Sequence, residues 1–208
     1  MRPETASNEK KLNIFSQRER NKRDKQNRII GAARALFQSR GYQQTTMAQI
    51  AAAADVATGT LFLYAKSKED LVILVFLDEM YDVVESSFAA RDTGSSALTG
   101  ILTFLRGIIE YHAADMDIAR ALMKELTFLS NPERSSDVSQ IAVTIVRRIR
   151  EILEQAISAG EVQLDDPHQV AEMMFSMYFQ QQQAWLANLS SRERLEENLS
   201  SMLGYLLR

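Results

Sequence analysis

Residues 45–64 read TTMAQIAAAADVATGTLFLY, two short helical patterns joined by a tight connection at Asp55-Val56. The first begins with Thr46-Met47-Ala48-Gln49, which matches a capping box, and its alanine-rich sequence predicts a helix through about Ala53. The second pattern runs from Ala57 to Tyr64. Two short helices at this spacing are typical of a helix-turn-helix, which puts one helix in a DNA groove and lays the other across the backbone.

A basic segment precedes this stretch. Residues 1–20 have little apolar periodicity and are predicted to form a flexible arm, although Ser16-Gln17-Arg18-Glu19 is a capping-box pattern that could start a helix before the apolar stripe. Six basic residues are concentrated between positions 18 and 28: Arg18, Arg20, Lys22, Arg23, Lys25 and Arg28. Such an arm suits contact with phosphates or with a minor groove.

Between this basic segment and the central stretch lies one more helix. Its buried face is predicted from apolar residues at intervals of three and four: Ile29, Ile30, Ala33, Leu36 and Phe37. Gly41 is placed to end the helix in the left-handed conformation, and Tyr42 can then fold back onto the apolar face.

The net charge of −3 conceals an asymmetry along the chain. Residues 1–70 hold 13 Lys and Arg against 7 Asp and Glu, a net charge of +6, whereas residues 71–208 hold 11 against 20, a net charge of −9. This distribution indicates that only the first third meets a polyanion. Charge alone is equally compatible with a solvated basic tail.

Every segment after the central stretch also reads as helix. Ser67-Lys68-Glu69-Asp70 opens a long helix to about Arg91, and later helices are predicted over residues 97–114, 117–129, 132–159, 168–188 and 191–207. Period-2 segments and Asn-Gly hairpins are missing from the sequence, so we expect an all-α protein of about nine helices. The predicted organisation is an arm (1–20), a helix-turn-helix domain (21–67) and a larger helical domain (68–208).

Several functional classes are disfavoured by the composition. Cysteine is absent, which excludes disulfides and thiolate sites, and the longest apolar run, residues 71–77, is too short to span a membrane. The first residues carry charges and lack the apolar core of a secretory signal, so a cytoplasmic location is expected. The chain has no HExxH, phosphate-binding loop or nucleophile elbow, and the spacing of His112, Asp115 and Asp117 fits no metal site. We therefore expect neither an enzyme nor a cofactor.

The residues that carry a family resemblance extend from about Arg28 to Leu71. They are Gly41-Tyr42, Thr45-Thr46-Met47, Gln49-Ile50-Ala51, Val56, Gly59-Thr60-Leu61, Tyr64 and Lys68-Glu69-Asp70-Leu71. In this pattern the chain resembles TetR-family (TetR/AcrR-like) transcriptional regulators. Two positions depart from it: Asp55 stands where the family usually has glycine, and Ala65 replaces an aromatic residue.

The resemblance implies which residues contact double-stranded DNA. Phosphate contacts are expected from Thr45, Thr46, Tyr64 and Lys68, with a half-buried aromatic as the alternative for Tyr64. The major groove would be faced by Ala57, Thr58, Gly59, Thr60 and Leu61. This second helix lacks Arg, Lys, Asn and Gln, so bidentate base contacts are not available from it. Sequence preference is then expected to depend on DNA shape and on the basic arm, including Arg20 and Arg23.

The resemblance also implies a homodimer and a small-molecule effector. The expected dimer interface lies on the last two helices at Trp185, Leu195, Leu199, Met202 and Leu206, with an intramolecular core as the alternative. The expected ligand-binding residues are Phe104, Tyr111, Met123, Phe128, Met174, Met177, Tyr178 and Gln181, although such a set is more often simply core. His112 is a further candidate polar anchor, set against a surface histidine near a helix end.

These expectations describe a repressor that a small apolar or amphipathic ligand releases from a pseudo-palindromic operator. The ligand would shift the helix that begins at Lys68 and thereby change the spacing of the two reading heads. The alternative is a DNA-binding regulator or architectural protein without a small-molecule ligand.

Overall fold

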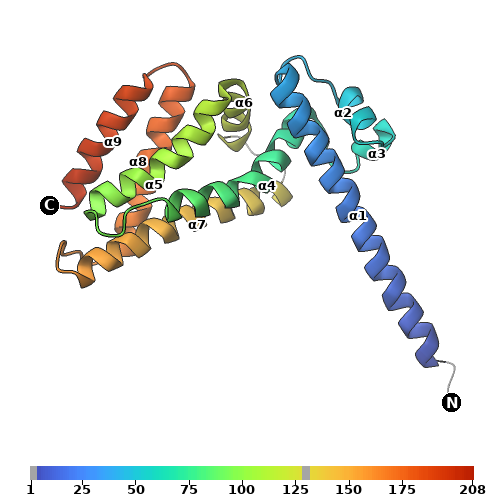
Figure 1. Cartoon of the computed structure of the whole chain (residues 1–208), viewed down its shortest axis with the longest axis horizontal. Helices are drawn as coiled ribbons and strands as arrows, with labels where there is room; N and C mark the ends of the chain where they lie inside the picture. The colour runs from blue at the N-terminus through green and yellow to red at the C-terminus, as the bar shows by residue number, and fades with distance from the viewer. Residues whose placement is uncertain (1–3, 128–131) are drawn as a thin grey trace. The chain divides into compact units, whose positions relative to one another are not determined.

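The computed structural model describes residues 4–127 and 132–208, and within these residues it contains nine α-helices and no strand (Figure 1). This confirms the predicted all-α class. The helices are α1 (Glu4–Arg40), α2 (Met47–Ala53), α3 (Thr58–Leu61), α4 (Lys68–Ala89), α5 (Ala97–Ala114), α6 (Met116–Thr127), α7 (Pro132–Ser158), α8 (Pro167–Leu186) and α9 (Arg192–Leu206). No helix among the described residues combines the length and the hydropathy needed to cross a bilayer.

The chain divides into two compact units, Met1–Val75 and Phe76–Arg208. The boundary falls inside α4, eight residues beyond the predicted boundary after residue 67. The first two turns of α4 therefore belong to the first unit, because their apolar side chains, such as Leu71 and Val72, are buried.

The first unit is built on the C-terminal part of α1. Ile29, Ala33 and Phe37 are at most 1% exposed and share their core with Ile50 of α2 and Leu61 of α3. Gly41 ends α1 with φ of +82° and its N–H donates to the Phe37 carbonyl at 2.9 Å. The ring of Tyr42 then lies 5.4 Å from that of Phe37, as the sequence predicts.

Helix α1 is much longer than the sequence indicates. It begins at Glu4, so the expected flexible arm is helical in the structure, and the capping pattern at Ser16 does not mark a helix start. Residues 4–30 contain no glycine or proline and many strong helix formers, which favours an uninterrupted helix. Apolar periodicity fails to predict this part because its described side chains, from Gln17 to Lys25, face solvent.

The second unit consists of the remainder of α4 and helices α5 to α9. Helix α7 packs along α8, α8 packs on α9, and α5 contacts α6, α7 and α9. A Cβ atom on Gly107 would lie 2.2 Å from the Ser87 hydroxyl, so glycine allows α5 to approach α4 closely. Asp166 caps α8: its carboxylate accepts from the backbone N–H groups of His168 and Gln169, ahead of a proline at the first helical position.

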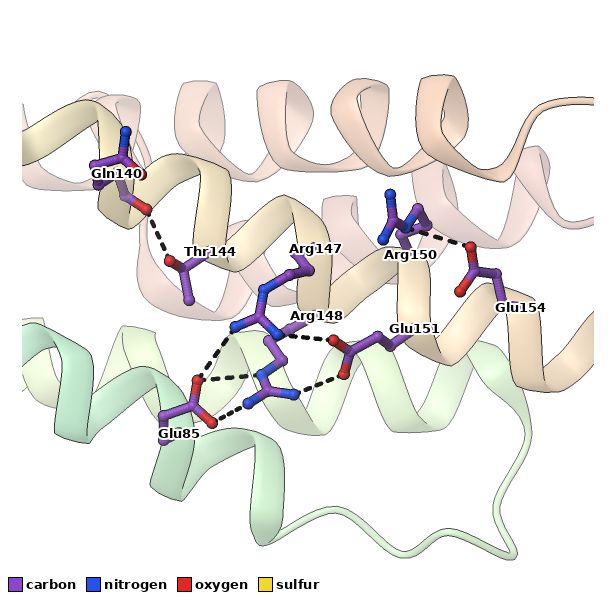
Figure 2. Close-up of polar contacts among 8 residues, drawn as sticks. All are labelled: Glu85, Gln140, Thr144, Arg147, Arg148, Arg150, Glu151 and Glu154. Atoms are coloured by element: carbon purple, nitrogen blue, oxygen red, sulfur yellow. Dashed lines mark hydrogen bonds and ion pairs between the residues drawn. The ribbon is translucent and has the colours of Figure 1, made fainter. Parts of the chain in front are cut away.

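A charged network joins α4 to α7 (Figure 2). The carboxylate of Glu85 on α4 pairs with both Arg147 and Arg148 on α7, and each arginine also donates to Glu151, at 2.9 and 2.7 Å. Hydrogen bonds to Glu85 raise the pKa of Arg148. The Arg148 guanidinium also lies 4.4 Å from the centre of the Phe88 ring, so charge and packing both hold the two helices together.

Candidate DNA-reading surface and effector cavity

Helix α2 is capped at its start and is followed by a turn at Asp55. The Thr46 hydroxyl accepts from the Gln49 N–H at 3.3 Å, and the Gln49 side chain accepts from the Thr46 N–H at 2.9 Å, which confirms the predicted capping box. Asp55 adopts φ of +52°, the conformation for which glycine is the usual residue. Its carboxylate lies 3.4 Å from the Arg28 guanidinium, so the substituted turn also gains an ion pair with α1.

Helix α3 presents one small face to solvent. Ala57, Thr58 and Gly59 are exposed and Thr60 is half-buried, in agreement with a surface that can enter a groove. Leu61 is fully buried in the core of the unit, so its predicted place facing DNA is wrong. Helical phase gives the reason: Leu61 lies one turn from the equally buried Ala65, on the inner face.

Two exposed apolar residues follow α3 and were missed by the sequence prediction. Phe62 is 42% exposed and Leu63 is 79% exposed, unusual values for side chains of this size and hydrophobicity. The signal that could have identified them is the same helical phase, because a buried Leu61 turns the next two residues outward. They extend the reading surface beyond the predicted set.

Gly59 has open space where a side chain would project. A Cβ atom built there meets nothing within 4 Å, so the glycine is not required by any neighbour in this chain. A glycine inside a helix costs roughly 1 kcal/mol relative to alanine. Close approach of the α3 backbone to another molecule would explain why that cost is tolerated.

Thr45 is buried rather than offered to a phosphate. It is 1% exposed, and its hydroxyl donates to the carbonyl of Gly41 at 2.9 Å or of Leu36 at 3.2 Å. Its N–H donates to the Tyr42 carbonyl at 3.3 Å. The prediction of a phosphate contact from Thr45 is therefore not supported, since this residue closes the end of α1. Thr46, in contrast, is exposed.

The two predicted phosphate ligands at the end of the motif, Tyr64 and Lys68, are half-buried. The Lys68 ammonium donates to the carbonyls of Tyr42 at 2.9 Å and Gln43 at 3.3 Å, and it lies 4.3 Å from the centre of the Tyr42 ring. Because an ammonium carries three N–H donors, one remains for a further acceptor. Lys68 thus joins the start of α4 to the loop that follows α1.

The basic residues before the motif belong to α1, the helix at the N-terminal end of the chain (Figure 1). Arg20 and Arg23 are exposed, as the predicted DNA contacts require. Arg18, Lys22 and Lys25 are exposed as well and recur at intervals of four and three, which places them on one face of the helix. That face continues directly into Ile29, the buried residue that packs into the helix-turn-helix core. We call Arg18, Lys22 and Lys25 the basic stripe.

A small apolar cavity lies within the second unit. Its volume is about 70 Å³ and its walls come from five helices. The lining residues are Phe76 and Met80 of α4, Ile108 and His112 of α5, Met123 and Leu126 of α6, Val138, Ile141, Ala142 and Ile145 of α7, and Phe175, Tyr178, Phe179 and Gln182 of α8.

Three polar side chains interrupt these apolar walls, and all three are buried. His112 is 5% exposed, which corrects the expectation of a surface histidine, and Tyr178 and Gln182 are each 2% exposed. Neither the Tyr178 hydroxyl nor the Gln182 Oε1 atom has a hydrogen-bond partner among the described residues. Burial raises the pKa of Tyr178, so its hydroxyl stays protonated.

The tautomer of His112 follows from its one hydrogen bond. Nδ1 lies 2.8 Å from the Ile108 carbonyl oxygen, which can only accept, so Nδ1 carries the proton. Burial lowers the pKa of His112 from 6.5 to about 4, and the ring is neutral near pH 7. The remaining nitrogen, Nε2, is therefore a hydrogen-bond acceptor.

The predicted ligand-binding residues divide between this cavity and other places. Met123 and Tyr178 line the cavity, whereas Phe104 and Met174 are fully buried elsewhere in the core. The others that are described lie outside the lining. Tyr111 donates to Glu79 at 2.5 Å, Met177 is half-buried, and Gln181 accepts from Asn198 at 2.9 Å. Phe128 lies outside the described residues. An apolar residue type does not distinguish a cavity wall from a filled core.

An open groove of about 440 Å³ adjoins the cavity at one shared residue, Met123. The groove is also lined by Arg120, Lys124 and Gln183. Arg120 donates to the Leu186 carbonyl at 3.0 Å and to Asn188 Oδ1 at 2.7 Å, which fixes it at the end of α8. Lys124 is exposed, so the mouth of the groove carries positive charge.

Most of the predicted dimer-interface residues are buried within the chain itself. Trp185 is 7% exposed, Leu195 is fully buried and Leu199 is 1% exposed, so the alternative of an intramolecular core holds for these three. Met202 and Leu206 are half-buried. The large apolar side chains that α8 and α9 turn outward are instead Met173, 43% exposed, and Tyr205, 75% exposed.

Comparison with known proteins gives matches to both units. The family described as "Bacterial regulatory proteins, tetR family" matches residues 29–75, and "Tetracyclin repressor-like, C-terminal domain" matches residues 101–185. The Bacillus subtilis (strain 168) "Fatty acid metabolism regulator protein" is 28% identical over 168 residues, which cover 80% of this chain and 86% of that protein.

Two similar solved structures contain acyl-CoA molecules. One is Thermus thermophilus FadR, described as a transcriptional repressor in complex with lauroyl-CoA, at a TM-score of 0.70 and 27% identity, covering 88% of this chain and 93% of that one. The other is Bacillus subtilis FadR in complex with stearoyl-CoA, at a TM-score of 0.63 and 26% identity, covering 86% and 96%.

Proposed function

Because the chain belongs to the TetR family of bacterial transcriptional regulators, we propose that it is a homodimeric repressor that an acyl-CoA releases from its operator. The DNA-binding part of this proposal is supported by the exposed face of α3 and by the basic stripe on α1. The effector part is supported by the apolar cavity and by the acyl-CoA molecules bound to the two similar regulators.

At the operator, the N-terminal part of α3 enters the major groove. Thr58 and Thr60 supply hydroxyls, and Phe62 and Leu63 offer apolar surface to thymine methyl groups. Thr46, Tyr64 and Lys68 contact phosphates, together with the basic stripe of α1, whereas Arg20 and Arg23 lie on the opposite face of that helix. Because α3 offers no bidentate partner for a base, sequence preference depends strongly on the shape and flexibility of the DNA.

A dimer is required because one α3 reads only a half-site, and a two-fold pair reaches two successive major grooves. We assign the interface to the outward faces of α8 and α9. Met173 and Tyr205 lie there as exposed apolar side chains, and interfaces of this kind are enriched in methionine and aromatic residues. Leu195 and Leu199 instead support the interface from within, as the packing between α8 and α9.

The effector proposal rests mainly on the position of the cavity, because residues of α4 form part of its wall. Phe76 and Met80 line the cavity, and the residues that precede them on the same helix, Lys68–Val75, belong to the DNA-binding unit. An effector that displaces Phe76 therefore acts on a helix that continues into the reading head. A ligand shifts the protein between two states only by binding one of them more strongly, and displacement of this wall provides that difference.

The cavity is so small that an effector must widen it in order to bind. A volume of about 70 Å³ holds roughly two water molecules, far less than the roughly 300 Å³ or more of sites for drug-sized ligands. The walls contain Met80 and Met123, whose unbranched side chains can rearrange readily. The acyl chain would enter past Met123, and the phosphates of CoA would remain in the groove beside Lys124.

The proposal is tested by measuring operator binding with and without an acyl-CoA. Operator fragments are selected from a DNA library with the full-length protein, and binding is followed by fluorescence anisotropy. Lauroyl-CoA and stearoyl-CoA should lower the affinity at least tenfold, whereas free CoA, the matched control without the acyl chain, should not. Unchanged affinity in the presence of both acyl-CoAs would remove the effector from the proposal but not the DNA binding.

A further inference from the structure

The polar side chains of the cavity indicate more about the effector than its apolar walls do. Tyr178 and Gln182 are four residues apart on α8, so they lie on the same face of the helix, and both line the cavity together with His112 of α5. All three are more than nine-tenths buried. A buried polar atom without a partner costs free energy, so an arrangement of this kind in a cavity wall requires an explanation.

The three groups have different hydrogen-bonding capacities. His112 Nε2 can only accept, because the ring proton is on Nδ1 and bonded to the Ile108 carbonyl. The Tyr178 hydroxyl can donate as well as accept, and it has no partner among the described residues. The Gln182 side chain can present either its oxygen or its NH2 group, because rotation of the amide exchanges them. The set therefore offers one fixed acceptor, one donor and one adaptable group.

Different oxygen groups of a ligand satisfy this set to different extents. The carbonyl of a thioester accepts from Tyr178 and leaves His112 Nε2 without a donor. A methylene chain satisfies none of the three. A hydroxyl group accepts from Tyr178 and also donates to His112 or Gln182, so it is the smallest oxygen group that meets both needs.

We propose that Tyr178, Gln182 and His112 bind a hydroxyl group carried by the effector, and that the preferred effectors are hydroxylated acyl thioesters. This inference rests on the proposed acyl-CoA response and narrows it. The acyl chain lies against the apolar walls of the cavity, which include Phe76 and Phe175. Its hydroxyl supplies the hydrogen-bond partner that Tyr178 lacks among the described residues. Discrimination against chains without the hydroxyl follows, because the methylene groups of such a chain leave the Tyr178 hydroxyl and the Gln182 Oε1 atom buried and without a partner among the described residues.

The first test compares matched ligands on the wild-type dimer. Lauroyl-CoA, its 2-, 3- and 12-hydroxy derivatives, and S-dodecyl-CoA, which lacks the carbonyl, are titrated calorimetrically and in the operator-release assay. At least one hydroxy derivative should bind about tenfold more tightly than lauroyl-CoA. The position of its hydroxyl then locates the polar set along the chain. Equal or weaker binding of all three derivatives would overturn the inference while leaving the acyl-CoA response in place.

The second test removes one hydroxyl from the protein. Tyr178→Phe should abolish the preference for the hydroxy derivative and leave lauroyl-CoA affinity within about threefold of wild type. Because the hydroxyl has no partner among the described residues, the thermal midpoint of the free variant should not fall. Tyr81→Phe, which removes an exposed hydroxyl outside the cavity lining, is the control and should retain the preference.

The outcomes separate the possible failures. A retained preference in Tyr178→Phe overturns the inference. A lower thermal midpoint of the free variant also overturns it, because the hydroxyl is then already satisfied, by bound water for example. If no acyl-CoA of any kind binds or releases the operator, the proposed effector class itself fails, and the inference with it.

Discussion

The two units of the chain treat buried hydroxyls in opposite ways. Thr45, in the first or DNA-binding unit, is 1% exposed and hydrogen-bonded to backbone carbonyls. Tyr178, in the second unit, which contains the cavity and is called the effector unit from here on, is 2% exposed and has no partner among the described residues. The Thr45 hydroxyl thus has its hydrogen bonds in place before the first unit meets a ligand. The effector unit leaves polar groups unsatisfied around a cavity. The difference suggests that the first unit acts as a rigid reading head and the second as the part that changes.

Glycines show the same contrast. Gly59 on α3 has open space around its missing side chain, on a surface that faces outward. Gly107 on α5 is pressed against Ser87 of α4. One glycine exposes backbone to an external partner, and the other allows two helices of the same chain to touch.

The largest expected effect concerns the charge of the DNA-binding unit. Replacing the basic stripe with glutamine (Arg18→Gln, Lys22→Gln, Lys25→Gln) should weaken operator binding by on the order of 100-fold or more. The basic stripe contributes three side chains from each chain of the dimer. If all six reach phosphates, their replacement should reduce the slope of log affinity against log salt by about five. Anisotropy titrations between 50 and 300 mM salt, about the range over which counterion release dominates, measure both.

The matched control neutralises exposed arginines of the effector unit, Arg194→Gln and Arg208→Gln. These changes should leave the salt slope unchanged. The same slope in the stripe variant and in the control would show that the helical extension of α1 does not contact DNA.

The effector unit should be the more sensitive of the two to acid. His112 titrates at about 4 when folded and near its ordinary 6.5 when unfolded. Between these values the unfolded chain binds a proton that the folded chain does not, so stability falls as pH decreases from about 6.5 to 4. The full loss is about 3 kcal/mol. Urea unfolding followed through Trp185 in the second unit, at several pH values, measures it.

Variants at the two histidines separate this effect from other acid effects. His112→Met should flatten the dependence on pH in that window, whatever its effect on stability near pH 7. His168→Gln, a change at an exposed histidine, should leave the dependence intact. A wild-type slope in His112→Met contradicts the assignment.

Removal of a hydroxyl should have opposite consequences in the two units. Thr45→Val deletes a buried donor and leaves its acceptors less satisfied, so we expect a loss of about 1 to 2 kcal/mol of unfolding free energy. Tyr178→Phe deletes a hydroxyl that has no partner in the described part of the chain, and it should cost no unfolding free energy. Thermal and urea unfolding of both variants measure the difference, and equal losses would show that the two hydroxyls do not differ in how they are satisfied.

The smallest expected change is at Gly59. Gly59→Ala should stabilise the free protein by about 0.5 to 1 kcal/mol, since alanine is the better helix former and its methyl group meets no neighbour. The same methyl group should weaken operator binding, because it occupies the surface that approaches DNA. Stabilisation without a loss of DNA affinity would place Gly59 outside the interface.

The sequence was a good guide to the DNA-binding unit because its signals are local. The capping box at Thr46, the left-handed Gly41 and the turn at Asp55 each depend on a few adjacent residues, and all are found as predicted. The main error there was at Leu61, which the family resemblance assigned to the DNA-facing surface and helical phase assigns to the core. The length of α1 was missed because an exposed helix has no apolar stripe to detect.

The candidate site in the effector unit was predicted much less completely. Met123 and Tyr178 were identified, but Phe104 and Met174 are core residues and Gln182, the neighbour of the predicted Gln181, is the one in the cavity. The reason is geometric, since five helices from distant parts of the chain bound this space. Whether an apolar residue faces the cavity depends on how those helices are rotated relative to one another, and a local sequence pattern does not predict that rotation.

The amino-acid sequence by itself determined the helical class, the position of the helix-turn-helix and the basic character of the segment before it. These properties arise from hydrogen bonds and periodicities within single helices and turns. Only the tertiary structure decided that Thr45 and Leu61 are internal, that Trp185 and Leu195 belong to the chain's own core, and that three polar groups meet in an apolar cavity. Burial and the lack of a partner are relations between distant segments, and they exist only once the helices have packed.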